Sequence, residues 1–298
     1  MTSPAMTTLQ PSKPPGRSGL QQKALRRFAR HKLAMFGSVT LGLIVLLTIF
    51  APLIAQHPPS SIDLLNRSQG PSLEHPLGTD ATGRDTLART LYGGRVSLAV
   101  GLVAVTLSTL IGVLIGSLSG YFRGRVDMVL MRLTDMVMTF PQLVIVIALV
   151  AVLGPSMFNT MFALGLLGWP TTARLVRSEF LRLREQDFVV AAQSLGARSG
   201  PVIFRHILPN VVGPLVVAIT LGVADAILIE ASLSFLGLGV QVPTPSWGNM
   251  LQSAQSLTTL QTLPWLWLSP GVMIILTVLS INFIGDGLRD ALDPKAVV

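Results

Sequence analysis

The amino-acid sequence predicts an all-α membrane protein with six transmembrane helices. Half of the 298 residues are hydrophobic and only 12% are charged, whereas soluble domains carry about 25% charged residues. Several long windows also contain no charged residue, and a helix needs about 20 mostly apolar residues to cross a bilayer. Most of the chain is therefore expected to pack against lipid rather than against water.

The uncharged windows place the spans. Residues 136–173 are too long for one helix, and Gly154, Pro155 and Ser156, followed by Asn159, supply a turn that divides them into spans three and four. The first apolar run ends without a small-x-small cleavage site, so it is expected to remain as an anchor. The six spans occupy residues 33–55, the window between Arg95 and Arg123, two helices within 136–173, 211–233 and 264–284.

Lysine and arginine residues are unevenly distributed about these spans. With the N-terminal segment in the cytoplasm, eighteen of them lie inside and four outside, and cytoplasmic loops of membrane proteins are rich in these residues. Both termini are therefore expected in the cytoplasm. The predicted divisions are a cytoplasmic N-terminal tail (1–32), the first transmembrane helix (33–55), an external segment (56–95), a transmembrane core (96–285) and a cytoplasmic C-terminal tail (286–298).

Several kinds of chemistry have no residues to support them. The chain has no cysteine, and none of its four lysines follows a glycine, which excludes the Gly-Lys-Ser/Thr end of a phosphate-binding loop. The four histidines are scattered without a pair at helical metal-ligand spacing, so no metal site is expected. The net charge of +8 lies at the edges of apolar runs, so nucleic acid is not an expected partner. We expect a non-catalytic protein that moves, gates or senses.

The loop between spans four and five is predicted to be a helix, a tight turn and a second helix. Residues 178–195 have helical composition, and Gly196 stands where a helix C-terminus adopts a positive φ. Ser199 is expected to cap the second helix with Pro201 in its first turn, and Pro209 to end it. The small residues around the turn either let another surface approach the backbone or pack against this chain's own helices.

This loop resembles the cytoplasmic signature of bacterial ABC-importer permeases, which is Glu-Ala-Ala, three residues, Gly, nine residues and Ile-x-Leu-Pro. Val190 stands at the glutamate position and His206 at the isoleucine position, and these two residues depart from the pattern. In that family the turn is a coupling helix that docks on an ATPase subunit. The resemblance implies a coupling loop formed by Ala191, Ala192, Gly196, Ala197, Leu208 and Pro209.

Further motifs narrow the resemblance to the C-type permease of dipeptide, oligopeptide and nickel importers. They are residues 75–85 (HPLGTDATGRD), 94–98 (GRVSL), 232–239 (SLSFLGLG), 243–248 (PTPSWG) and 285–295 (GDGLRDALDPK). The resemblance implies the type I ABC importer permease fold and a bacterial inner-membrane location. It also implies as partners a second homologous permease, two ATPase subunits that bind ATP and Mg, an external binding protein and a di- or oligopeptide substrate.

Alternative functions are the import of nickel or another small solute, a self-sufficient channel or secondary transporter, and a membrane scaffold or sensor.

Asp225 and Glu230 lie within span five, where ionised carboxylates are costly unless they meet a partner or water. Each is a candidate for the translocation pathway, for structural pairing or for an interfacial position. Arg84, Asp85 and Trp247 are candidates for contact with the binding protein or the second permease; mutual pairing of Arg84 with Asp85 and an interfacial anchor at Trp247 are the alternatives.

Overall fold

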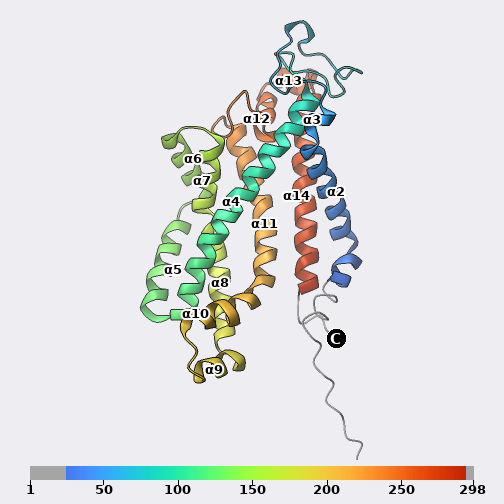
Figure 1. Cartoon of the computed structure of the whole chain (residues 1–298). Coiled ribbons are helices and arrows are strands. Elements are labelled where there is room, and N and C mark those ends of the chain that lie inside the picture. Colours follow the sequence, from blue (N-terminus) through green and yellow to red (C-terminus); the bar gives the residue numbers. More distant parts are fainter. Residues whose placement is uncertain (1–24, 293–298) are drawn as a thin grey trace, which may run out of the picture.

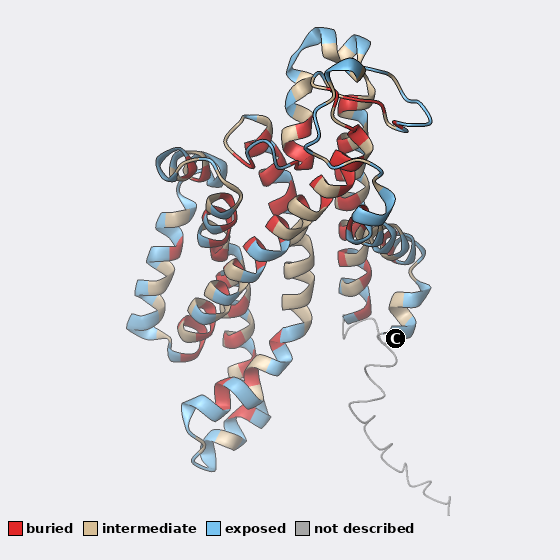
Figure 2. Ribbon diagram, turned by 45° about the horizontal axis from the view of Figure 1, so that its top comes forward, coloured by how far each residue is buried: buried red, intermediate tan, exposed pale blue. Residues whose placement is uncertain are grey.

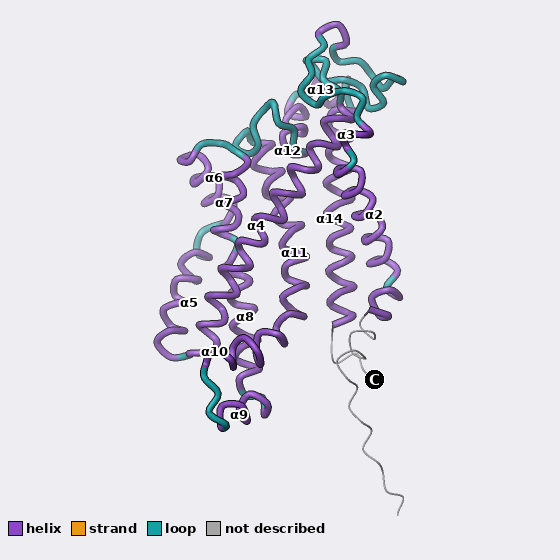
Figure 3. The backbone as a smooth tube through the Cα atoms, viewed as in Figure 1, coloured by secondary structure: helices purple, strands orange, loops and turns teal. Residues whose placement is uncertain are grey.

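The computed structural model describes residues 25–292, which form a bundle of helices (Figures 1 and 3). Four long helices run along the bundle: α2 (Lys32–Ile49), α4 (Thr86–Phe122), α11 (Leu208–Phe235) and α14 (Trp265–Leu292). Helix α14 packs against both α2 and α11, and α4 crosses the bundle diagonally between α11 and α8. The prediction of an all-helical fold is confirmed over the described residues, which contain no strand longer than an isolated bridge.

Shorter helices complete the structure. A helical hairpin is built from α5 (Gly124–Met138), α6 (Gln142–Leu153), α7 (Met157–Leu167) and α8 (Trp169–Arg184). The remaining elements are α3 (Ala51–Ile54), η1 (Leu64–Asn66), α9 (Asp187–Ser194), α10 (Ser199–Pro201), η2 (Val202–Ile207), α12 (Trp247–Leu251), η3 (Gln252–Gln255) and α13 (Leu257–Thr262).

By length and apolar composition, four described helices are able to cross a membrane: α2, α4, α14 and the continuous run from Ser199 to Phe235 that contains α11. Helices α5 and α6 together make a fifth candidate, but they meet at an angle of 81°. The predicted fourth span falls on α7 and α8, which are separated at Gly168. The structure thus confirms a polytopic helical protein, and the count of six spans remains a prediction.

The turn predicted within residues 136–173 is present. Gly154 adopts φ +87°, Ser156 caps α7 by accepting a hydrogen bond from the N–H of Asn159, and the Asn159 amide donates to the carbonyl of Gly154 at 2.8 Å. The breaks before Pro141 and at Gly168 were not predicted. Absence of charge marks an apolar window, but it carries no information on where a helix bends inside that window.

Helices α4 and α8 approach each other along a row of glycines, Gly112, Gly116 and Gly120, spaced one turn apart on α4. A Cβ atom on Gly116 would lie 2.5 Å from the carbonyl oxygen of Ala173 on α8. Small residues at this spacing let two helix backbones approach closely, which is a common interface in membranes. The buried residues follow this seam and the inner faces of α4 and α11, whereas the outer faces are exposed and apolar (Figure 2).

The two ends of the bundle differ. One end carries the cap, defined here as residues 55–85 together with α12 and α13, where most of the loop structure gathers (Figure 3). The other end carries the α9 loop, defined here as residues 185–207 (Figure 1). His31, before α2, lies 3.6 Å from Asp290 in α14, so both ends of the described chain lie at the α9 end.

Candidate functional site

The α9 loop has the geometry of a helix, a tight turn and a second helix. Gly196 adopts φ +81° as predicted, and the N–H of Ala197 donates to the carbonyl of Ala192 at 3.1 Å. A residue with a side chain rarely adopts this conformation. The N-terminal part differs from the prediction, because the chain breaks at Glu185 and Gln186 instead of continuing as one helix.

Two predictions for the second half of the loop are wrong. Ser199 is the first residue of α10 and Arg198 occupies the cap position, without a side-chain hydrogen bond. Pro209 does not end a helix, since it lies in the first turn of α11. The π-helix η2 precedes it, and the N–H of Leu208 donates to the carbonyl of Ile203, five residues back. This wider turn lets the helix continue through a proline, which cannot donate a backbone hydrogen bond.

The loop is fixed to the bundle by an apolar cluster. Val189 of α9 is fully buried against Phe180 of α8, and Val202 and Ile207 of η2 are also fully buried there. Ala197 and Leu208, two residues of the predicted coupling loop, pack on this cluster. The cluster thus joins α9 to the end of α8 and to η2, which leads directly into α11.

The outer side of the same loop exposes apolar side chains. Leu195, next to the turn, is 89% exposed, and Phe204 in η2 is 68% exposed. Phe188 and Val190 of α9 are about half exposed, and Ala191 beside them is also exposed. Exposed apolar residues that stand among arginines at the end of a bundle indicate a protein contact surface. The glutamate of the family pattern is replaced at this surface by the apolar Val190.

An ion pair and a hydrogen bond join the base of the loop to the α4–α5 turn. Arg123 lies 2.5 Å from the carboxylate of Glu185, and Arg184 donates a hydrogen bond of 2.5 Å to the carbonyl of Tyr121. The hydrogen bond from Arg123 holds the pKa of Glu185 below its usual range. The α9 loop is thus tied to two helices that enter the bundle.

Asp225 of α11 lines a cavity of about 360 Å³ between α4, α8 and α11. Its carboxylate makes no hydrogen bond or ion pair with any residue between 25 and 292. The other polar groups of the cavity are Ser108, Thr109, Gln142, Thr171 and Thr172. This carboxylate is therefore available to a solute or to water inside the bundle.

Glu230 has a different environment, although it lies in the same helix. Its side chain is fully buried and accepts hydrogen bonds from Ser97 of α4 at 2.9 Å and from Ser234 at 2.7 Å. Ser97 also accepts a bond from the backbone N–H of Trp247, at the start of α12. Glu230 thus joins α4, α11 and α12, which matches the structural alternative in the prediction.

Trp247 is fully buried as well, so its ring does not lie on the surface. Its indole N–H donates to the carbonyl of Thr90 at 2.9 Å. The ring also fills the space beside Gly94, where an added Cβ would lie 2.8 Å from it. Trp247 therefore fixes α12 to the first turns of α4.

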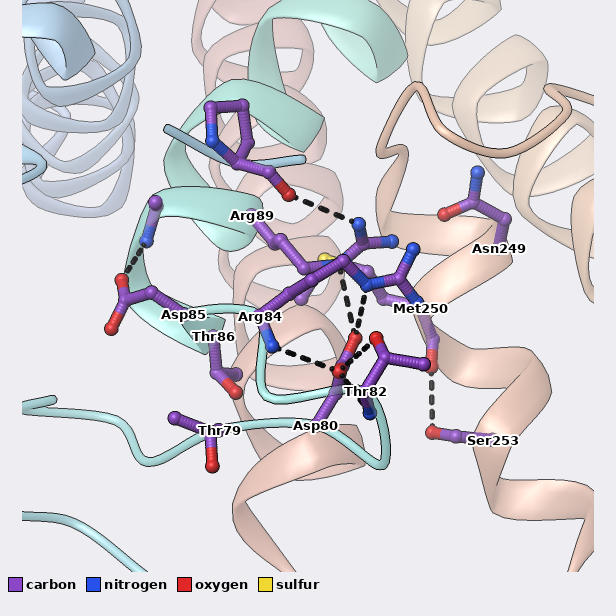
Figure 4. Close-up of polar contacts among 12 residues, drawn as sticks. Thr79, Asp80, Thr82, Arg84, Asp85, Thr86, Arg89, Asn249, Met250 and Ser253 are labelled. Atoms are coloured by element: carbon purple, nitrogen blue, oxygen red, sulfur yellow. Dashed lines mark hydrogen bonds and ion pairs between the residues drawn. The ribbon is translucent and has the colours of Figure 1, made fainter. Parts of the chain in front are cut away.

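In the cap, Arg84 and Asp85 do not pair with each other, although adjacent opposite charges suggested it. Arg84 pairs with Asp80 at 2.7 Å, and Arg89 approaches the same carboxylate at 3.8 Å (Figure 4). Burial raises the pKa of Asp80, but hydrogen bonds from Thr82 and Arg84 outweigh it and hold the pKa below its usual range.

Asp85 instead caps α4. One carboxylate oxygen accepts a hydrogen bond of 2.7 Å from the N–H of Ala88, and the other lies 2.9 Å from Nδ1 of His75. Asp85 and His75 are both buried. A consecutive Arg-Asp pair thus serves two separate contacts, because the turn before α4 directs the two side chains apart.

The cap also joins His75 to His57, which are distant in the sequence. Their ring centroids are 4.8 Å apart, and Glu74 lies beside them. Sequence reasoning treated the histidines as scattered, since helical spacing detects only ligands that share one helix. No signal in a single sequence places a loop residue beside another loop.

These features define a polytopic membrane protein with an internal cavity that a carboxylate lines, a cap at one end and a projecting loop at the other. Residues 112–298 match the family described as "binding-protein-dependent transport system inner membrane component", and residues 19–71 match the "N-terminal TM domain of oligopeptide transport permease C". The chain therefore belongs to the family of inner membrane components of binding-protein-dependent transport systems, and it is an ABC transporter permease component.

Curated relatives align over nearly the whole chain. A putative peptide permease protein of Brucella suis is 45% identical over 95% of this chain and 93% of its own length. The dipeptide transport system permease protein DppC of Alkalihalophilus pseudofirmus is 44% identical, over 92% of this chain and 90% of its own. The oligopeptide transport system permease protein OppC of Bacillus subtilis is also 44% identical, over 93% and 90%.

Proposed function

We propose that this chain is one of two permease subunits of an ATP-driven importer for di- or oligopeptides. An external binding protein delivers the substrate, and two separate ATPase subunits bind ATP and Mg. The names of the relatives support a peptide substrate. The α9 end lies in the cytoplasm, so both termini do as well, since cytoplasmic segments carry the excess of Lys and Arg.

The observation that carries this function is the α9 loop. It projects from the bundle (Figure 1), exposes Leu195 and Phe204, and is fixed to α8 and η2 through the buried Val189. A surface of this kind suits a partner whose position must be transmitted into the bundle. A partner shifts a conformational equilibrium only by its different affinity for the two states, so docking on this loop depends on the nucleotide state of the ATPase.

A contiguous set of contacts connects the loop to the pathway. Arg177 of α8, which lies between the loop and the cavity, binds Asp127 of α5. Helix α8 also packs directly on the glycine row of α4. The cavity with Asp225 lies along this same α4–α8 seam. Movement of α8 relative to α4 changes the shape of the cavity, which is the coupling that alternating access needs.

Within the cavity, Asp225 is the group that receives a positively charged part of the substrate. The amino terminus of a peptide is such a group, and a carboxylate at this depth is a costly feature to keep without a partner. Glu230 has no such role, since its carboxylate holds α4, α11 and α12 together.

The cap faces the external binding protein. Of the three predicted contact residues there, Arg84 keeps some exposed surface, whereas Asp85 and Trp247 are buried. Arg84 therefore contacts the binding protein, and Asp85 and Trp247 act indirectly by holding the cap to α4.

Two substitutions at fully exposed leucines test the docking surface. We expect Leu195→Ser, in the α9 loop, to weaken co-purification of the ATPase subunits about tenfold. This factor corresponds to about 1.4 kcal/mol of binding free energy, which is the contribution expected of one apolar side chain in an interface. The matched control is Leu65→Ser, in the cap, where the leucine is 93% exposed. Equal co-purification of both variants and the wild type contradicts the docking assignment.

Uptake measurements test the substrate. Proteoliposomes with the complete complex and its binding protein should accumulate a labelled dipeptide or oligopeptide on addition of ATP. Accumulation of Ni²⁺ without peptide uptake would assign the alternative substrate and leave the permease assignment intact.

A further inference from the structure

The cap brings together three side chains that are able to bind a metal ion. His57 follows α3, and Glu74 and His75 precede α4, so the residues come from two segments of the chain. Each offers one ligand atom, and these atoms all lie within 4.8 Å of one another. Two imidazole nitrogens and one carboxylate oxygen are a ligand set found in zinc sites.

An unsatisfied atom in this group points to a ligand. Nε2 of His57 is buried and has no hydrogen-bond partner in the structure. A buried polar atom without a partner is energetically costly, so such atoms generally have a protein, water or ion partner. The neighbouring groups at this position are another imidazole and a carboxylate, which suit a cation better than a further donor.

The second imidazole is already oriented as metal ligands are. Nδ1 of His75 lies 2.9 Å from the carboxylate of Asp85, and Asp85 is itself held by the N–H of Ala88. In a neutral imidazole that donates from Nδ1 to a carboxylate, the lone pair lies on Nε2, the atom that then binds a metal. Asp85 thus adds to its capping of α4 a positioning contact on His75.

We propose that His57, Glu74 and His75 bind one divalent transition-metal ion, with Zn²⁺ as the metal to be tested and water completing the coordination. Ligand atoms around tetrahedral zinc are about 3.4 Å apart, given bonds of about 2.1 Å. The three ligand atoms must therefore move about an ångström closer to one another to bind the ion. The exposed side chain of Glu74 is free to make most of that movement.

The site would connect the segment after α3 to the segment before α4. Arg89 makes a weaker link between the same regions, a 3.3 Å hydrogen bond to the carbonyl of Pro59. Because metal binding at such a site is coupled to local folding, the ion orders the cap at the end of α4. This inference concerns a structural site and does not depend on the transported substrate.

Binding is tested on the full-length chain in detergent, purified with a tag that contains no histidine and treated with EDTA. Titration with Zn²⁺ in a calorimeter should show one ion per chain. Glu74→Gln should weaken binding at least tenfold, and His57→Gln should abolish it. The matched control His206→Gln removes an imidazole at the other end of the bundle and should bind as the wild type does.

A second measurement reports on the cap itself. Limited proteolysis should cleave residues 55–85 more slowly with Zn²⁺ than with EDTA in the wild type and in His206→Gln, but not in Glu74→Gln. Glu74 is exposed and its substitution should leave the fold intact, which circular dichroism checks. Wild-type chain that binds no stoichiometric Zn²⁺ at micromolar concentration, or binding unchanged in both Glu74→Gln and His57→Gln, overturns the proposal.

Discussion

Arg177 on α8 donates two hydrogen bonds, of 2.5 and 2.7 Å, to the two carboxylate oxygens of Asp127 on α5. Paired bonds of this kind restrict orientation as well as distance. Ser119 of α4 donates to the same carboxylate, so three helices meet at Asp127. The contact lies between the α9 loop and the cavity, on the route that we propose for coupling.

This pair should contribute to stability more than a neighbouring pair between the same helices. The side chains of Arg177 and Asp127 are 32% and 19% exposed, against 50% and 53% for Arg174 and Asp135. Arg177→Gln should lower the free energy of unfolding by about 1–3 kcal/mol, and Arg174→Gln by less than about 1 kcal/mol. Denaturation of the purified chain measures both, and equal effects would contradict this ranking.

A glycine-to-alanine substitution should have opposite effects on stability inside and outside the glycine row. Gly116→Ala places a methyl group 2.5 Å from the carbonyl oxygen of Ala173, which should cost about 1–3 kcal/mol through overpacking. Gly42→Ala in α2 meets no atom within 4 Å, and alanine favours a helix by up to about 1 kcal/mol. The melting temperature should therefore fall for Gly116→Ala and stay the same or rise for Gly42→Ala.

Substitutions of the two carboxylates of α11 should affect different properties, uptake at Asp225 and stability at Glu230. Asp225→Asn should leave expression and the melting temperature unchanged and reduce ATP-driven uptake of peptides with a free amino terminus by at least fivefold, because the cavity loses the one carboxylate that residues 25–292 supply to it. Glu230→Gln should lower melting, because it weakens the bonds from Ser97 and Ser234. Unchanged uptake and substrate preference in Asp225→Asn contradicts the pathway role.

Asp80 makes the cap sensitive to acid. Its pKa is lower in the folded chain than in the unfolded chain, so its contribution to stability is present above the unfolded value of about 3.9. That contribution is lost as the pH falls through the lower, folded pKa. Proteolysis of the cap between pH 6 and 3 should show this loss in the wild type and a flatter profile in Asp80→Asn. Identical profiles would exclude Asp80 as the cause.

The turn of the α9 loop provides a paired test of coupling. Gly196 requires φ +81°, whereas Gly200 does not adopt a positive φ, and neither has an atom within 4 Å of an added Cβ. Gly196→Val should lower peptide uptake per ATP hydrolysed by at least fivefold, because the turn is strained. Gly200→Val should preserve this ratio, and normal transport by Gly196→Val would contradict the coupling role.

The local features that a single residue type determines were predictable from sequence. Gly196 adopts the positive φ expected of it, and the turn predicted at Gly154, Pro155 and Ser156 is present. Pro209 was misjudged because a prolyl residue excludes its own N–H bond but not a π turn before it. Contacts between distant segments, such as His57 with His75 or Trp247 with α4, depend on tertiary packing that periodicity does not encode.

The α9 loop was predicted as a docking surface from resemblance, and the structure adds the physical basis for that proposal. Val189 is buried and Leu195 is exposed, although both are apolar and six residues apart in one loop. Hydrophobicity alone does not distinguish the side chain that anchors the loop from the one that stays exposed on its outer side. The fold of η2 against α8 makes that distinction.

The most direct test of the central claim is solute flux in liposomes. The chain reconstituted with a second permease, two ATPase subunits and the binding protein should accumulate peptide only when ATP is present. The chain reconstituted alone should transport nothing. Peptide flux through this chain alone, without ATP or partners, would contradict its assignment as a permease subunit driven by separate ATPases.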